Sequence, residues 1–134
     1  MKELYEDYRD DVQFFVVYVR EAHALDGPSP LGGNGMPIVE DPVSLAERNA
    51  VAQVCMTKLA LEPIPALVDD LDDAVGRAYA GHPDRLYLVG REGKIAYHGF
   101  EGPMGFDPEE LEEAIRAELG ERGGGAKVDG LPLR

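Results

Sequence analysis

The feature that most constrains the fold is the run VQFFVVYV at residues 12–19, in which almost every side chain is β-branched or aromatic. A continuous run of this kind is typical of a strand that is covered on both faces in a parallel sheet. Parallel strands need long crossover connections, which are usually helices. A chain of 134 residues has the ordinary length of one domain with a core of its own. We therefore expect a single α/β domain built around this strand.

The remaining segments alternate between helical and extended patterns. Asp41 before Pro42, and Ser44 three residues before Glu47, are typical of the start of a helix. In chain order we expect a helix end at 2–10, the strand at 12–19, a loop at 24–40, a helix from 41 to Pro63, a strand at 64–68, a helix at 71–79, an antiparallel hairpin at 85–100 and a helix at 107–119. This order predicts a mixed sheet flanked by helices in a domain at 1–119, followed by a flexible tail at 120–134.

Charge argues against two classes of partner. Acidic residues outnumber basic ones 26 to 13, and the formal net charge is -13. Phosphate backbones and anionic membrane surfaces would repel such a chain, so we expect neither nucleic acid nor membrane as a partner. Residues 1–20 show neither the pattern of a signal peptide nor that of a membrane-spanning helix, which favours the cytoplasm.

Cysteine and metal chemistry are narrowly limited. Cys55 is the only cysteine, which excludes an internal disulfide, a CxxC pair and a cysteine-based zinc site within one chain. Cys55 lies on the apolar stripe of its helix, where a thiol behaves as a small hydrophobe with a raised pKa. No metal or cofactor is expected. The aspartates at 69, 70, 72 and 73 do not have the spacing of a calcium loop. The three histidines, His23, His82 and His98, do not have the spacing of a helical zinc pair.

Glu21 and His23 are the first candidates for chemistry. They follow the strand at its carboxyl end, where open α/β sheets bind their ligands. In an extended segment the two side chains share a face, so the carboxylate can orient the imidazole and raise its pKa. That arrangement would place a proton donor near neutral pH. The alternative is structural, with His23 pinning the loop by hydrogen bonding and Tyr18 packed in the core.

Three stretches carry a resemblance to a known family: FFVVYVREAHALDG, AER...LEPIPALVDD and PDRLYLVGREGKIAYHGFEGPMGF. They resemble the iodothyronine deiodinases and their bacterial deiodinase-like relatives over Leu4 to Leu119. The resemblance implies a thioredoxin-like fold whose nucleophile, a cysteine or selenocysteine, lies in a loop upstream of residues 2–10. The first strand of that fold would lie between 12–19 and 85–90, and the chain begins after it. We expect a lone monomer to be poorly stable, and either an upstream start or a homodimer to compensate.

The resemblance also implies roles for individual residues. Tyr18, Glu21 and His23 match the family motif, where they assist the selenol and protonate the substrate carbon that loses iodide. Arg85 occupies a position where peroxidase relatives carry an arginine that stabilises a thiolate; the alternative is an exposed arginine paired with Asp84 or Glu101. Pro83 is a candidate for the cis-proline of thioredoxin-like folds.

Glu101 is the main departure from the family. Deiodinases carry a basic residue in this glycine-rich segment, taken to hold the hormone carboxylate, so the charge is reversed here. A carboxylate would meet an acidic wall, and we expect a peroxide or a small halogenated compound in place of thyroid hormone.

Two functions follow as expectations. The first is a deiodinase-like oxidoreductase that uses a thiol reductant for reductive dehalogenation or peroxide reduction in the intact domain, inactive as the chain stands. The alternative is a non-catalytic thioredoxin-fold binding module that reuses the cleft around Tyr18, Glu21 and His23; a purely structural fragment remains open as a third class.

Overall fold

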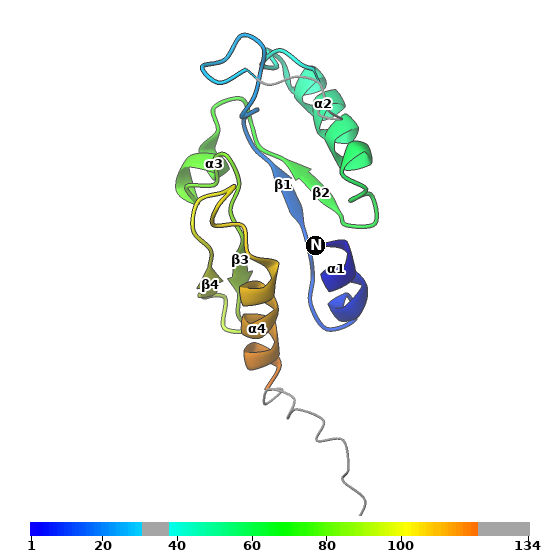
Figure 1. Cartoon of the computed structure of the whole chain (residues 1–134), viewed down its shortest axis with the longest axis vertical. Helices are drawn as coiled ribbons and strands as arrows, with labels where there is room; N and C mark the ends of the chain where they lie inside the picture. Colours follow the sequence, from blue (N-terminus) through cyan, green and yellow to red (C-terminus); the bar gives the residue numbers. More distant parts are fainter. Residues whose placement is uncertain (31–37, 121–134) are drawn as a thin grey trace, which may run out of the picture.

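The computed structural model describes residues 1–30 and 38–120, and within them it is a mixed α/β structure (Figure 1). The described elements are, in chain order, α1 (Lys2–Tyr8), β1 (Val16–Tyr18), α2 (Leu45–Lys58), β2 (Ala66–Val68), α3 (Ala74–Ala78), β3 (Tyr87–Val89), β4 (Ile95–His98) and α4 (Pro108–Leu119). The expected α/β class and order of elements are confirmed. The predicted tail lies outside the described residues from 121 onward, as does the part of the 24–40 loop at 31–37.

The strands form two separate pairs. β1 and β2 are parallel, with Val17 opposite Leu67, while β3 and β4 are antiparallel, with Leu88 opposite Tyr97. The expectation of one mixed sheet is therefore wrong for the described residues. The physical reason is that β1 has a ladder partner on one side only, so nothing hydrogen-bonds it to β3.

β1 itself differs from its prediction. The run at 12–19 forms ladder hydrogen bonds only at Val16–Tyr18, and Phe15 and Val17 remain 54% and 40% exposed. The predicted burial on both faces is wrong, because a strand paired along one edge leaves its other edge and part of its faces uncovered.

A shared core nevertheless joins the two halves of the molecule. α4 packs against β3 and β4, as expected for the last helix, and α2 packs against β2. Figure 1 shows α1 and α4 on either side of the space between the two strand pairs. The buried cluster draws on α1, the segment before β1, the segment before β2, β3 and α4: Leu4, Tyr8, Phe14, Ile64, Leu86, Leu88, Leu111 and Ile115. The hydrophobic contacts thus bridge a gap that no strand hydrogen bond spans.

The N-caps of α2 and α4 are the predicted Ser44 and Asp107. The alternative start of α2 at Asp41 and Pro42 is wrong, because the capping contacts form at Ser44, and α2 ends at Lys58, before the expected end at Pro63. The Ser44 side chain accepts a hydrogen bond from the backbone N–H of Glu47 at 3.2 Å, and the Val43 N–H donates to the Glu47 carboxylate at 3.0 Å. Asp107 caps α4 in the same manner, with Pro108 in the first turn. The His82–Pro83 peptide bond is cis. No helix in the described ranges combines the length and apolar character needed to cross a membrane.

Candidate functional site

Tyr18, Glu21 and His23 form a connected network at the carboxyl end of β1. The Tyr18 hydroxyl donates to Glu21 Oε2 at 2.6 Å, and the backbone N–H of His23 donates to Glu21 Oε1 at 3.1 Å. The carboxylate therefore holds the tyrosine and the backbone of the histidine at once. The imidazole itself is not its partner, which differs from the pairing proposed from the sequence.

The His23 ring has a different anchor. Its Nδ1 lies 3.0 Å from the carbonyl oxygen of Ser29. A carbonyl only accepts, so this contact places the proton on Nδ1 and leaves Nε2 as the second ring nitrogen, an acceptor in the neutral ring and a donor in the imidazolium. The histidine thus pins the loop, as the structural alternative held.

Tyr18 and Cys55 share this environment. Burial, followed by the hydrogen bond to Glu21 and its negative charge, raises the pKa of Tyr18 well above its ordinary value, so the hydroxyl keeps its proton. Burial and the Glu21 charge also raise the pKa of the Cys55 thiol, while a hydrogen bond with Tyr18 acts in the opposite direction. The raised thiol pKa confirms the expectation for Cys55 and disfavours the thiolate form.

Beneath the network lies a buried cation that the sequence analysis did not single out. Arg48 on α2 is only 2% exposed and pairs with Asp73 at 2.8 Å. The same nitrogen also lies within hydrogen-bonding distance of the carbonyl oxygens of Asp69 and Asp70. The available signal was the i, i+4, i+8 spacing of Arg48, Ala52 and Met56, which places a charge on the buried stripe of a helix.

Three of the aspartates before α3, Asp69, Asp70 and Asp72, accept backbone N–H groups. Asp69 is 4% exposed, and its carboxylate accepts N–H groups of Asp70, Val75 and Gly76. Burial alone would raise its pKa, but these N–H donors and the positive Arg48 outweigh burial and lower it. This capping accounts for the late start of α3, at Ala74, relative to the predicted helix at 71–79.

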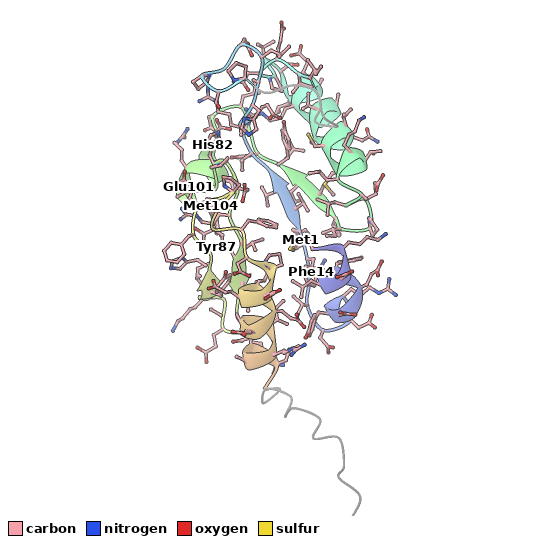
Figure 2. All side chains as sticks on the ribbon, viewed as in Figure 1. Met1, Phe14, His82, Tyr87, Glu101 and Met104 are labelled. Atoms are coloured by element: carbon pink, nitrogen blue, oxygen red, sulfur yellow. The ribbon has the colours of Figure 1, made fainter. Side chains whose placement is uncertain are left out.

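A cavity of about 310 Å³ includes Glu101 in its lining. Figure 2 labels Glu101 and His82, both of which line this cavity. The cavity is lined by Val19, Arg20, Asp73, Gly76, Arg77, Ala80, His82 and Glu101. Val19 packs against Gly76 of α3, whereas Tyr18 belongs to the face of β1 that holds Cys55. The structure therefore places Glu101 and the Tyr18 network on different sides of β1.

Arg85 does not line this cavity. Its Nε is buried without a hydrogen-bond partner among the described residues, as is Oδ1 of the neighbouring Asp84. Its predicted pairing with Asp84 or Glu101 is not among the ion pairs of the described residues. Arg85 as a thiolate-stabilising residue stays a prediction.

Comparison with known proteins adds information about ancestry. A family model described as iodothyronine deiodinase matches residues 1–118. Type I iodothyronine deiodinase of Xenopus laevis is 33% identical over 108 residues, covering 81% of this chain and 40% of the relative. Thyroxine 5-deiodinase of Gallus gallus is 31% identical over 110 residues, covering 82% and 41%. Type II iodothyronine deiodinase of Homo sapiens is 28% identical over 123 residues, covering 90% and 45%. The chain thus spans about two fifths of the length of the curated relatives it matches.

Proposed function

The chain belongs to the iodothyronine deiodinase family, and from this membership we propose that it forms the larger part of a thioredoxin-like oxidoreductase domain. In this proposal the nucleophile is a thiol or selenol outside these 134 residues. The substrate is a small halogenated compound or a peroxide, and a thiol is the reductant. The single observation that supports it most is the network of Tyr18, Glu21 and His23 at the carboxyl end of β1.

In reductive dehalogenation by such a domain, two thiols supply the two electrons that the reaction requires. The carbon–halogen bond breaks, the carbon takes up a proton, and halide leaves, while two thiols are oxidised to one disulfide and release one further proton. His23 is suited to deliver the proton, since its Nδ1 is held by Ser29 and its Nε2 is the remaining ring nitrogen. Tyr18 keeps its proton and, through Glu21, fixes the position of the His23 backbone.

The two separate strand pairs support the proposal, because a thioredoxin-like sheet without one central strand would leave a gap between such pairs. Val16 donates to Pro65 and Tyr18 accepts from Asp69, so both residues face β2. Because successive residues of a strand direct their polar backbone groups to opposite edges, Val17 faces the uncovered edge of β1. An added strand on that edge would restore the hydrogen bonds between β1 and β3, and a second copy of the chain is the alternative source of such a strand.

The reading frame upstream of Met1 tests this proposal directly. It should encode a strand followed by a loop that contains a cysteine codon or an in-frame UGA. An ordinary promoter at that place would contradict the enzyme function and leave the binding module as the better account.

The chain by itself should show no thiol-dependent dehalogenation or peroxide reduction, because its one thiol has a raised pKa. The measurement is oxidation of a dithiol in the presence of peroxide or an aryl iodide, with Cys55→Ser as the matched control. Turnover that disappears in Cys55→Ser would refute the proposal, since Cys55 would then be the nucleophile.

A further inference from the structure

The ring of His23 takes its orientation from the loop segment at 24–30. Its Nδ1 lies 3.0 Å from the carbonyl oxygen of Ser29, six residues further along the chain. Ser29 stands between Pro28 and Pro30. Proline fixes its own φ at about −65° and confines the residue before it to extended conformations, so Ser29 has little backbone freedom. The acceptor of the imidazole is therefore a carbonyl with a restricted direction.

This segment is connected to the residues that lead into α2. The Asp41 N–H donates to Asp26 Oδ1 at 2.8 Å, and the Leu25 N–H donates to the carbonyl oxygen of Val39 at 2.9 Å. Of these two contacts only the first uses a side chain, that of Asp26. Asp26 lies midway along the chain between His23 and the residue that holds its ring. Its contact therefore fixes the backbone on which the acceptor of the imidazole depends.

The tautomer of the ring decides which nitrogen exchanges a proton with a ligand. A backbone carbonyl has no proton to donate, so its hydrogen bond to Nδ1 keeps a proton there in both the neutral ring and the imidazolium. When the imidazolium of His23 gives up its Nε2 proton, the Nδ1–H tautomer remains and the bond to Ser29 stays intact. A ring released from Ser29 can also lose its Nδ1 proton. Part of the population would then present the wrong nitrogen.

We propose that Asp26 is a positioning residue for His23, whose hydrogen bond to the Asp41 N–H fixes the loop so that the Ser29 carbonyl selects the Nδ1–H tautomer. Asp26 is exposed, and its described contact is with the backbone of Asp41 and not with the imidazole. It therefore acts through the loop backbone. The inference deepens the proposed function and rests on it in one respect, because His23 is the proton donor there.

The tautomer is measured by NMR on the chain as it stands, from the chemical shifts of the imidazole nitrogens at about pH 8.5, where an ordinary histidine is neutral. The Nδ1–H form of His23 should predominate in the wild type. Asp26→Ala removes the acceptor of the Asp41 N–H and should lower the ratio of Nδ1–H to Nε2–H about threefold to fivefold, the effect of losing one ordinary hydrogen bond. Asp26→Asn keeps an oxygen at the same place and should hold the ratio within about twofold of the wild type.

Two further variants are the controls. Ser29→Ala keeps the backbone carbonyl, and Asp10→Ala removes an exposed aspartate just after α1. Both should leave the tautomer ratio of His23 within about twofold of the wild type. His82 and His98 report in the same spectra whether a variant is still folded, because their shifts should not change.

A wild-type ring that is mainly Nε2–H, or an unchanged ratio in Asp26→Ala, would overturn the inference. A loss in Asp26→Asn as large as that in Asp26→Ala would do the same, since the charge of the aspartate and not its hydrogen bond would then control the ring. An equal loss in either control would also count against it. No readout involves turnover, so a failure here is distinguishable from a failure of the proposed enzyme function.

Discussion

At the scale of single residues, carboxylates connect the elements around the end of β1 through hydrogen bonds and an ion pair. Glu21 joins a tyrosine hydroxyl to a histidine backbone, Asp69 caps α3 from a buried position, and Asp73 neutralises buried Arg48. The surroundings of Asp69 lower its pKa, so its contribution to stability should depend on pH.

Asp69 allows a direct test of this pH dependence. Its pKa is lowered in the folded protein, so its contribution to stability is complete above the ordinary carboxyl pKa of about 3.9 and is lost as the pH falls through the lower folded value. Asp69→Asn should therefore cost stability at pH 6 and progressively less below about pH 4.

The measurement is the free energy of unfolding in urea, determined for both proteins from neutral pH down to about pH 2.5. Asp10→Asn is the control, because Asp10 is exposed and follows α1. A difference between wild type and Asp69→Asn that stays constant across this range would show that the Asp69 carboxylate is not stabilised by its N–H donors.

At the scale of elements, the sequence predicted existence and order better than extent. Asp107 located the start of α4, because a cap depends on side chains within one turn. For α2 the sequence offered both Asp41 and Ser44, and only Ser44 is the cap. The extents of β1 and α3 were overestimated, because a ladder depends on a partner strand and the start of α3 depends on buried Asp69. Tyr18, Glu21 and His23 could be named as a group, but only coordinates show that Glu21 bonds the His23 backbone while Ser29 bonds its ring.

The uncovered edge of β1 predicts a specific pattern of amide hydrogen exchange. The Val16 N–H donates to Pro65 at 2.9 Å, whereas the Val17 N–H faces the edge without a ladder partner. In the chain as given, the Val17 amide should exchange at least about tenfold faster than that of Val16, as expected for an unpaired strand edge.

NMR-detected amide exchange measures this difference, and the comparison of two protein concentrations is the control for pairing between copies. Protection of Val17 that grows with concentration would indicate strand pairing between copies. Equal protection of Val16 and Val17 at low concentration would contradict the description of β1 as a strand paired on one side.

At the scale of the whole molecule, two strand pairs share one hydrophobic core without sharing a sheet. Leu88 of β3 and Ile115 of α4 belong to the same buried cluster as Leu4 of α1 and Phe14. Phe15, just before β1, and Val17 within it have exposed side chains. A strand added on the uncovered edge would pair with the backbone groups of Val17 and would end beside the Tyr18 network, which is where the proposed nucleophile is needed.

The most direct test of the account is iodide release from an aryl iodide by the product of the whole reading frame, with a dithiol as reductant. Tyr18→Phe and His23→Asn should each reduce kcat, and the loss in His23→Asn should be about a hundredfold or more, the usual contribution of a general acid. His98→Asn in β4 is the matched control and should stay within twofold. The account is contradicted if His23→Asn retains wild-type turnover, or if His98→Asn loses as much activity as His23→Asn.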